Sequence, residues 1–131
     1  MNKYIFSLIC FLFMMALPMN AQSESSTKVY DAVDEMPSFP GGLNGLMTFL
    51  AQNMVYPVTA QENGVQGRVT VSFVVETDGS ITDVKVARSV DPFLDREAMR
   101  IVKAMPKWTP GKKDGKPVRV KYTVPVVFRL Q

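Results

Sequence analysis

Two stretches of the chain alternate between hydrophobic and polar residues, which is the pattern of a β-strand with one buried face. In the first, from Arg68 to Glu76, every second residue is hydrophobic. A return strand that contains Val84 and Val86 follows it. In the last stretch the hydrophobic residues occupy the even positions Val118, Val120, Tyr122, Val124, Val126, Phe128 and Leu130. We therefore expect three strands, each with one face against a core.

The intervening segments show the spacing of amphipathic helices. Four hydrophobic residues predict a helix over Leu43 to Asn53, and Val58 to Asn63 predicts one more helical turn. Another helix begins at Asp91, because an N-cap residue is followed there by Pro92 at the first helical position. Its apolar stripe consists of Leu94, Ala98, Ile101, Val102 and Met105.

The connections are marked by turn residues. Asp78-Gly79 is typical of a two-residue type I′ hairpin and joins the first two strands. Lys112 to Lys116 reads as a charged loop that leads into the last strand. Before the first helix, Val29 to Met36 is interpreted as a weak strand or an extended arm.

These elements predict an α+β domain, with a three-stranded antiparallel sheet, helices packed on one face and the N-terminal extended arm before it. A right-handed crossover through the later helix puts the last strand beside the first strand of the hairpin. The strand order is then second, first, third, and the last strand lies at an edge of the sheet.

A proline inside the last strand supports an edge position, because proline in a sheet is confined to edges, bulges and strand starts. Pro125 is flanked by Arg119, Lys121 and Arg129, which are charges that guard exposed edges against unwanted pairing. The same edge would also accept another chain. The two interpretations, a protected edge and a docking edge, stay open at this point.

The N-terminal segment predicts export. Tyr4 to Leu17 is an apolar run of fourteen residues, and the small residue Ala21 occupies the −1 position for cleavage before Gln22. The run is short for a spanning helix, so we expect a signal peptide over residues 1–21, with an uncleaved anchor as the alternative. Residues 22–28 are expected to form a flexible tail and residues 29–131 the domain.

The composition excludes several classes of site. The chain has no histidine, and its one cysteine, Cys10, lies in the predicted signal peptide. The usual ligands of zinc, the usual general base and disulfides are therefore missing from the domain. The carboxylates Asp91, Asp95 and Glu97 form a cluster, but they suit a helix cap and the charged opening of a helix. We expect no catalytic residues, no metal, no cofactor and no enzymatic activity.

Charge is unevenly distributed between the two halves. Residues 22–84 carry two cationic and eight anionic side chains, which is a net charge of −6. Residues 85–131 carry twelve cationic and four anionic side chains, which is a net charge of +8. A basic half can indicate nucleic-acid binding. Export argues against that partner, and pairing of opposite charges within one fold explains the asymmetry, although a basic face can also meet an acidic protein or a membrane surface.

The chain resembles the C-terminal domain of TonB, in the form common in Bacteroidetes. The resemblance is carried by MPSFPGG (Met36 to Gly42), the stretch from Tyr56 to Val86, LDREAMRIVKAMPKWTPG (Leu94 to Gly111) and VPVVFRL (Val124 to Leu130). These segments cover nearly all of Val29 to Leu130. The family fold is a small α+β domain with a three-stranded antiparallel sheet.

The resemblance implies a function. TonB couples the inner-membrane proton gradient to outer-membrane receptors, and its C-terminal domain binds a short receptor segment, the TonB box, by β-strand addition. Carried over to this chain, the docking edge is Arg119 to Arg129. The partner-binding residues that we expect are Gln61, Arg119, Lys121, Thr123, Pro125, Val127 and Arg129. Gln61 corresponds to the glutamine of the family's Tyr-Pro-x-x-Ala-Gln stretch.

The chain also departs from a complete TonB, which has a functional histidine in its anchor and a long proline-rich spacer. Gln22 to Val29 contains no proline, and its eight residues extend to only about 26 Å. We therefore expect a free-standing periplasmic binding module in TonB-dependent transport. The alternatives are a membrane-anchored energy transducer and a dimeric structural or regulatory domain that pairs through the edge strand. No small-molecule substrate and no nucleic acid are expected.

Overall fold

A computed structural model of the chain describes residues 27–130. The predicted signal peptide and most of the predicted tail lie outside the described residues. The elements follow the order β1 (Val29–Tyr30), α3 (Gly42–Asn53), α4 (Val58–Glu62), β2 (Gly67–Val75), β3 (Ile81–Arg88), α5 (Pro92–Lys103), β4 (Gly111–Lys113) and β5 (Lys116–Phe128). Among these helices, none has the length and apolar character needed to span a membrane.

The sheet confirms the predicted α+β class. It also confirms that the first strand of the predicted hairpin, which is β2, lies between the other two predicted strands. β2 pairs antiparallel with β3 on one side and with β5 on the other. The strand count differs from the expectation, because β1 pairs with β5 in parallel and β4 pairs with β5 antiparallel. The full path is β1-β5-β2-β3, with β4 attached to β5. The added strands are only two and three residues long, which is too short for an alternating pattern to reveal.

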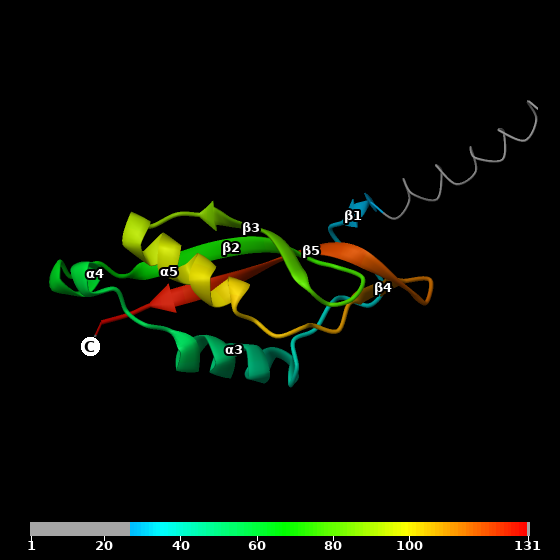
Figure 1. Ribbon diagram of the computed structural model, residues 1–131, viewed down its shortest axis with the longest axis horizontal. Helices are drawn as coiled ribbons and strands as arrows, with labels where there is room; N and C mark the ends of the chain where they lie inside the picture. Colours follow the sequence, from blue (N-terminus) through cyan, green and yellow to red (C-terminus); the bar gives the residue numbers. More distant parts are fainter. Residues whose placement is uncertain (1–26, 131) are drawn as a thin grey trace, which may run out of the picture.

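The core lies between the sheet and its helices. Figure 1 shows α5 in front of β2 and α3 below β5. Buried residues of β2, α5 and β5 form one hydrophobic cluster, into which α3 inserts Leu46 and Leu50. Trp108 completes the cluster, with ring centroids 5.0 Å from Tyr122 and 5.3 Å from Phe73. The alternating residues of the sequence therefore face the layer of helices.

The first hairpin turn is not of type I′, so that prediction was wrong. A type I′ turn needs positive φ at both central residues, and Asp78 is not among the positive-φ residues, whereas Gly79 has a φ of 88°. The Glu76 amide donates to the Ser80 carbonyl at 2.8 Å, and the Gly79 amide donates to the Glu76 carbonyl at 2.9 Å. The loop is therefore one residue longer, and the Asp78 carboxylate stabilises it by accepting from the backbone and hydroxyl of Ser80.

A type I′ turn lies instead in the stretch that we expected to be a charged loop. Asp114 and Gly115 have φ values of 54° and 76°, and Lys113 pairs with Lys116 directly across them. β4 and the start of β5 therefore form a second hairpin. This hairpin lengthens β5 to 13 residues, so that the strand extends beyond the end of β2.

Candidate functional site

The outer edge of β5 is divided into a covered part and an open part. Val120 pairs with Val75 of β2 and also with Tyr30 of β1, which places β1 on the edge of β5 opposite β2. The β1 pairing involves only Arg119 and Val120 of β5. Within residues 27–130, no strand pairs with this edge from Lys121 to Phe128. We call this part the open edge.

Pro125 shows which backbone groups face the open edge. The register between β2 and β5 runs without a break from Gly67 opposite Phe128 to Val75 opposite Val120, and Pro125 lies opposite Thr70. In an antiparallel ladder, hydrogen-bonded and non-hydrogen-bonded pairs alternate. Because Pro125 has no amide hydrogen, it suits a non-hydrogen-bonded pair. The amide and carbonyl groups of Thr123 and Val127 then point away from β2, towards the open edge.

The side chains of this half of β5 divide by parity. Val124, Val126 and Phe128 are buried in the core. Five of the predicted partner-binding residues are exposed: Lys121, Thr123, Pro125 and Val127 in β5, and Arg129 directly after it. These odd-numbered positions lie opposite in parity to the buried ones, beside the open edge.

Arg119 lies at the boundary of the open edge. Its guanidinium forms two hydrogen bonds with the Glu76 carboxylate, at 2.8 and 3.1 Å, and donates to the Thr27 carbonyl at 2.7 Å. The bonds from Arg119 hold the pKa of Glu76 below its ordinary value. Arg119 therefore binds the N-terminal arm to Glu76 at the end of β2. β1 occupies the edge of β5 at Arg119 and Val120.

Gln61 lies away from the strand but at the same end of the molecule as Arg129. It is exposed in α4, which Figure 1 places beside the C-terminal end of β5. Tyr56 fixes this placement, because its ring contacts Phe128 edge-on with centroids 5.7 Å apart and its hydroxyl donates to the Val65 carbonyl. The backbone of Gln61 continues the helix by donating to Pro57 at 2.9 Å.

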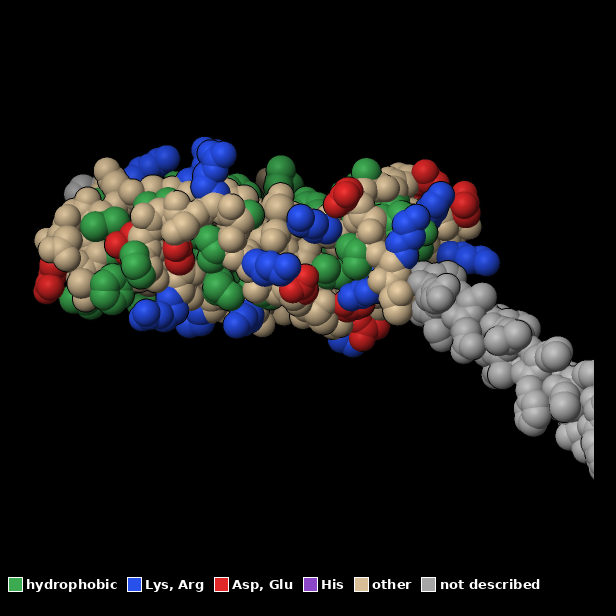
Figure 2. All heavy atoms as spheres, turned by 90° about the horizontal axis from the view of Figure 1, so that it is seen from above, with side chains coloured by type: hydrophobic (Ala, Val, Ile, Leu, Met, Phe, Trp, Pro, Cys, Tyr) green, Lys and Arg blue, Asp and Glu red, His purple; other side chains and the backbone are tan. Residues whose placement is uncertain are grey.

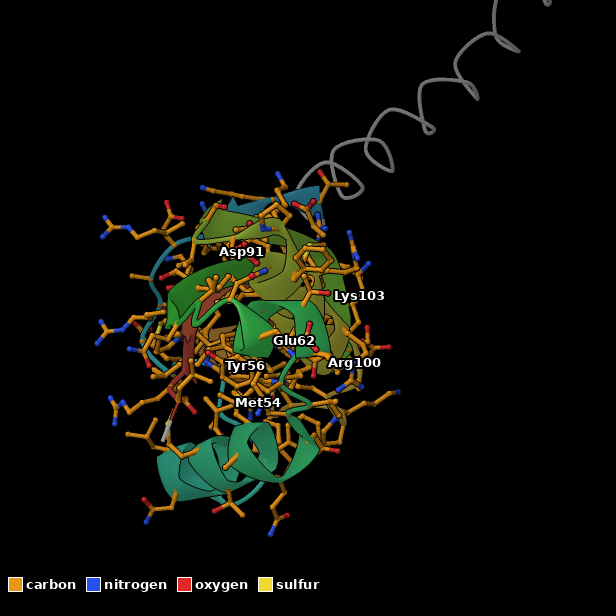
Figure 3. All side chains as sticks on the ribbon, turned by 90° about the vertical axis from the view of Figure 1, so that its left-hand side faces the viewer. Met54, Tyr56, Glu62, Asp91, Arg100 and Lys103 are labelled. Carbon is orange, nitrogen blue, oxygen red and sulfur yellow. The ribbon has the colours of Figure 1, made fainter. Side chains whose placement is uncertain are left out.

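The sequence did not identify the residues that hold the linker between α3 and α4. Glu97 of α5 is 8% exposed and accepts a hydrogen bond from the Val55 amide at 2.7 Å. Arg100 donates twice to Glu97, at 2.7 Å each, and once to the Asn53 carbonyl at 2.8 Å. Figure 3 faces this end of the molecule and labels Met54 and Tyr56 of the linker and Arg100 of α5. In the sequence, the only sign of this arrangement was that Glu97 and Arg100 are opposite charges three positions apart on one helix.

Comparison with known proteins agrees with this architecture. A family model described as Gram-negative bacterial TonB protein C-terminal matches residues 52–130. The chain belongs to this family. The TonB C-terminal match begins at the end of α3 and includes α4, the linker, the β2–β3 hairpin, α5 and β5. It therefore covers the open edge and the elements around it, whereas β1 and nearly all of α3 precede it.

Individual TonB proteins show the same relationship. The chain is 29% identical to Protein TonB of Helicobacter pylori over 114 residues, which cover 82% of this chain and 39% of that protein. It is 39% identical to Protein TonB of Pseudomonas aeruginosa over 80 residues, which cover 59% of this chain and 22% of that protein. The chain thus matches about two fifths or less of these relatives.

A solved structure supports the fold. The solution NMR structure of Helicobacter pylori TonB-CTD, residues 179–285, has a TM-score of 0.54 and 28% sequence identity, covering 68% of this chain and 80% of that one. The resemblance of this sequence to the TonB C-terminal domain is therefore confirmed, and so is the α+β fold that it implied.

Proposed function

We propose that this TonB C-terminal domain binds an extended segment of an outer-membrane receptor, related to a TonB box, by adding it as a strand along the open edge of β5. The chain is then a binding module in TonB-dependent transport and not an enzyme, and its place of action is the periplasm. Gln61 and the exposed side chains from Lys121 to Arg129 contact the bound segment.

The observation that carries the proposal is the outer side of β5 between β1 and the end of the strand, with which no strand pairs within residues 27–130. In β-strand addition, main-chain hydrogen bonds provide affinity and alternate side chains provide specificity. The outward amides of Thr123 and Val127 supply such donors. Lys121 and Arg129 flank them and favour a segment with acidic or polar residues at the matching positions.

Proline substitution tests the proposal at the outward positions. Thr123→Pro and Val127→Pro each remove an amide that makes no bond to β2, so the fold is retained while peptide binding is weakened about tenfold. Thr123→Ala and Val127→Ala are the matched controls, because they truncate the side chain and keep the amide. Binding is measured by titrating the 15N-labelled chain with TonB-box peptides from the same genome. Unchanged affinity in both proline variants would overturn the proposal.

A second candidate function is energy transduction by the chain itself, with its N-terminal segment retained as an anchor. The similarity to proteins named TonB over 82% of the chain favours it. The intact mass of the protein from its own cell envelope distinguishes the two functions. A mass that includes residues 1–21 supports the transducer, and a mass without them supports the free-standing module.

A further inference from the structure

A second surface of this domain is a groove between the α3–α4 linker and α5. It has a volume of about 460 Å³ and is lined by Val55, Pro57, Phe93, Arg96, Glu97 and Arg100. The groove is distinct from the open edge, since none of these residues belongs to β5. The linker contributes the apolar residues Val55 and Pro57 to this lining, and α5 contributes Phe93 and the three charged residues.

The apolar side chains around this groove are unusually accessible. Val55 is 65% exposed and the neighbouring Val58 is 66% exposed, although both lie in a segment that packs Tyr56 into the domain. Phe93 is 39% exposed at the first turn of α5. Figure 2 shows hydrophobic side chains reaching the surface towards the end of the molecule that carries α4. Contiguous exposed apolar side chains with a polar rim indicate an interaction site.

The linker cannot hide these side chains by moving inward, because α5 holds its backbone. Glu97 binds the Val55 amide and Arg100 binds the Asn53 carbonyl. These two bonds fix both ends of the short segment Asn53–Val55 and turn the side chain of Val55 outward. The groove is therefore a preformed feature of the folded domain.

The accessible charge at the groove is positive. The side chain of Glu97 is 9% exposed and its charge is balanced by Arg100. Arg96 lies over the ring of Phe93, 5.6 Å from its centroid, and takes part in no ion pair among residues 27–130. A cation beside an aromatic floor suits a ligand that carries a carboxylate next to a large apolar side chain.

We propose that this groove binds an acidic peptide segment of a protein partner, in which a bulky apolar side chain lies between Val55 and Phe93 and a neighbouring Asp or Glu pairs with Arg96. The site is independent of strand addition at β5. It gives the domain a second contact, formed by side chains, at the end where the linker meets α5.

Dye-labelled peptides test the proposal on the full chain, with fluorescence anisotropy as the measurement. Three peptides of equal length alternate Leu with Glu, Ser or Lys. We expect the Leu/Glu peptide to bind most tightly and the Leu/Lys peptide most weakly. Arg96→Glu should weaken the Leu/Glu peptide about fivefold, and Phe93→Ser about tenfold because it removes the apolar floor. Lys103→Glu is the control, because it makes the same charge change on an exposed part of α5 outside the groove.

The outcomes separate the alternatives. Val127→Pro should leave Leu/Glu binding unchanged while it weakens TonB-box binding at the open edge, so failure of one site is distinguishable from failure of the other. The proposal is overturned if Arg96→Glu and Phe93→Ser have no more effect than Lys103→Glu, or if Val127→Pro abolishes Leu/Glu binding. It is also overturned if light scattering shows a dimer that Phe93→Ser dissociates, since a second copy would then occupy the groove.

Discussion

At the scale of single residues, a carboxylate that suited a helix opening in the sequence proved to hold the α3–α4 linker against α5. Glu97 is buried, and burial by itself raises the pKa of a carboxyl group. The hydrogen bonds from Arg100 and from the Val55 amide outweigh burial, so the pKa of Glu97 lies below its ordinary value of 4.5. The charged form of Glu97 therefore stabilises the folded domain.

Neutralising this carboxylate should destabilise the domain in a pH-dependent way. Glu97→Gln leaves Arg100 without its anion, and we expect the free energy of unfolding at pH 7 to fall by about 1–3 kcal/mol. Because the folded pKa is lowered, the contribution of Glu97 is present above pH 4.5 and is lost as the pH falls through the folded value. The difference between wild type and variant, measured by urea unfolding, should therefore shrink below pH 4.5.

A surface ion pair provides the control for this experiment. Asp83 lies 3.5 Å from Lys85, and both side chains are more than half exposed. Asp83→Asn should change stability by less than about 1 kcal/mol, and asparagine tolerates the positive φ of this position. An equal loss in the two variants, or a difference for Glu97→Gln that persists at low pH, would contradict this role of Glu97.

At the scale of elements, two Asp-Gly pairs of identical sequence form different turns. The pair at Asp114 closes a two-residue loop, whereas the pair at Asp78 lies within a longer loop. The longer loop is held from outside, because the Trp108 amide donates to the Gly79 carbonyl at 2.8 Å. A tertiary contact thus fixes the position of the first turn, and no local pattern could have predicted the difference.

Alanine substitution at the two glycines should separate backbone strain from packing. Both glycines have positive φ, 88° at Gly79 and 76° at Gly115, but a Cβ on Gly79 would overlap the Trp108 carbonyl, while a Cβ on Gly115 would meet no atom within 4 Å. We expect Gly115→Ala to cost about 1–2 kcal/mol and Gly79→Ala to cost more than about 3 kcal/mol. Urea unfolding measures both losses. Similar losses would mean that the contact with Trp108 adds nothing.

At the scale of the whole molecule, the binding that we propose for the open edge requires this edge to select a partner and to avoid pairing with itself. Two copies that pair antiparallel with Pro125 opposite Pro125 place Lys121 of each strand opposite Arg129 of the other, the residue that directly follows β5. Like charges directly opposite each other destabilise strand pairing. Lys121 and Arg129 therefore oppose this homodimer, and the segment that we propose as the partner would instead bring acidic or polar side chains.

Reversing one of these charges should make the domain self-associate. Lys121→Glu turns both repulsive pairs of the overlapped dimer into attractive ones, so we expect light scattering to show a larger mass that grows with protein concentration, while the wild type stays monomeric. Lys85→Glu is the matched control, because Lys85 lies in β3, away from the open edge. A dimeric wild type, or the same behaviour in both variants, would rule out this account of the edge.

The spacing of hydrophobic residues was sufficient to predict the principal helices and strands, because each of them buries one face. A buried face repeats every two residues in a strand and about every 3.6 residues in a helix. The cap at Asp91 was likewise visible, because capping is local: its carboxylate accepts from the amides of Phe93 and Leu94. The sequence predicted that the last strand lies at an edge, whereas β5 lies between β1 and β2 and only its part around Pro125 is open. Pro125 did mark that open part, because the missing amide hydrogen is a property of the residue itself.

The tertiary structure alone decided how long the open edge is and what surrounds it. β1 covers Arg119 and Val120 through pairs with a segment about ninety positions earlier in the chain. Glu97 and Arg100 likewise turn Val55 outward from more than forty positions away. These contacts depend on which distant residues the folded backbone brings together, and no local pattern of the sequence shows that. The sequence by itself determined the elements and their buried faces, and long-range pairing determined which surfaces were left open to a partner.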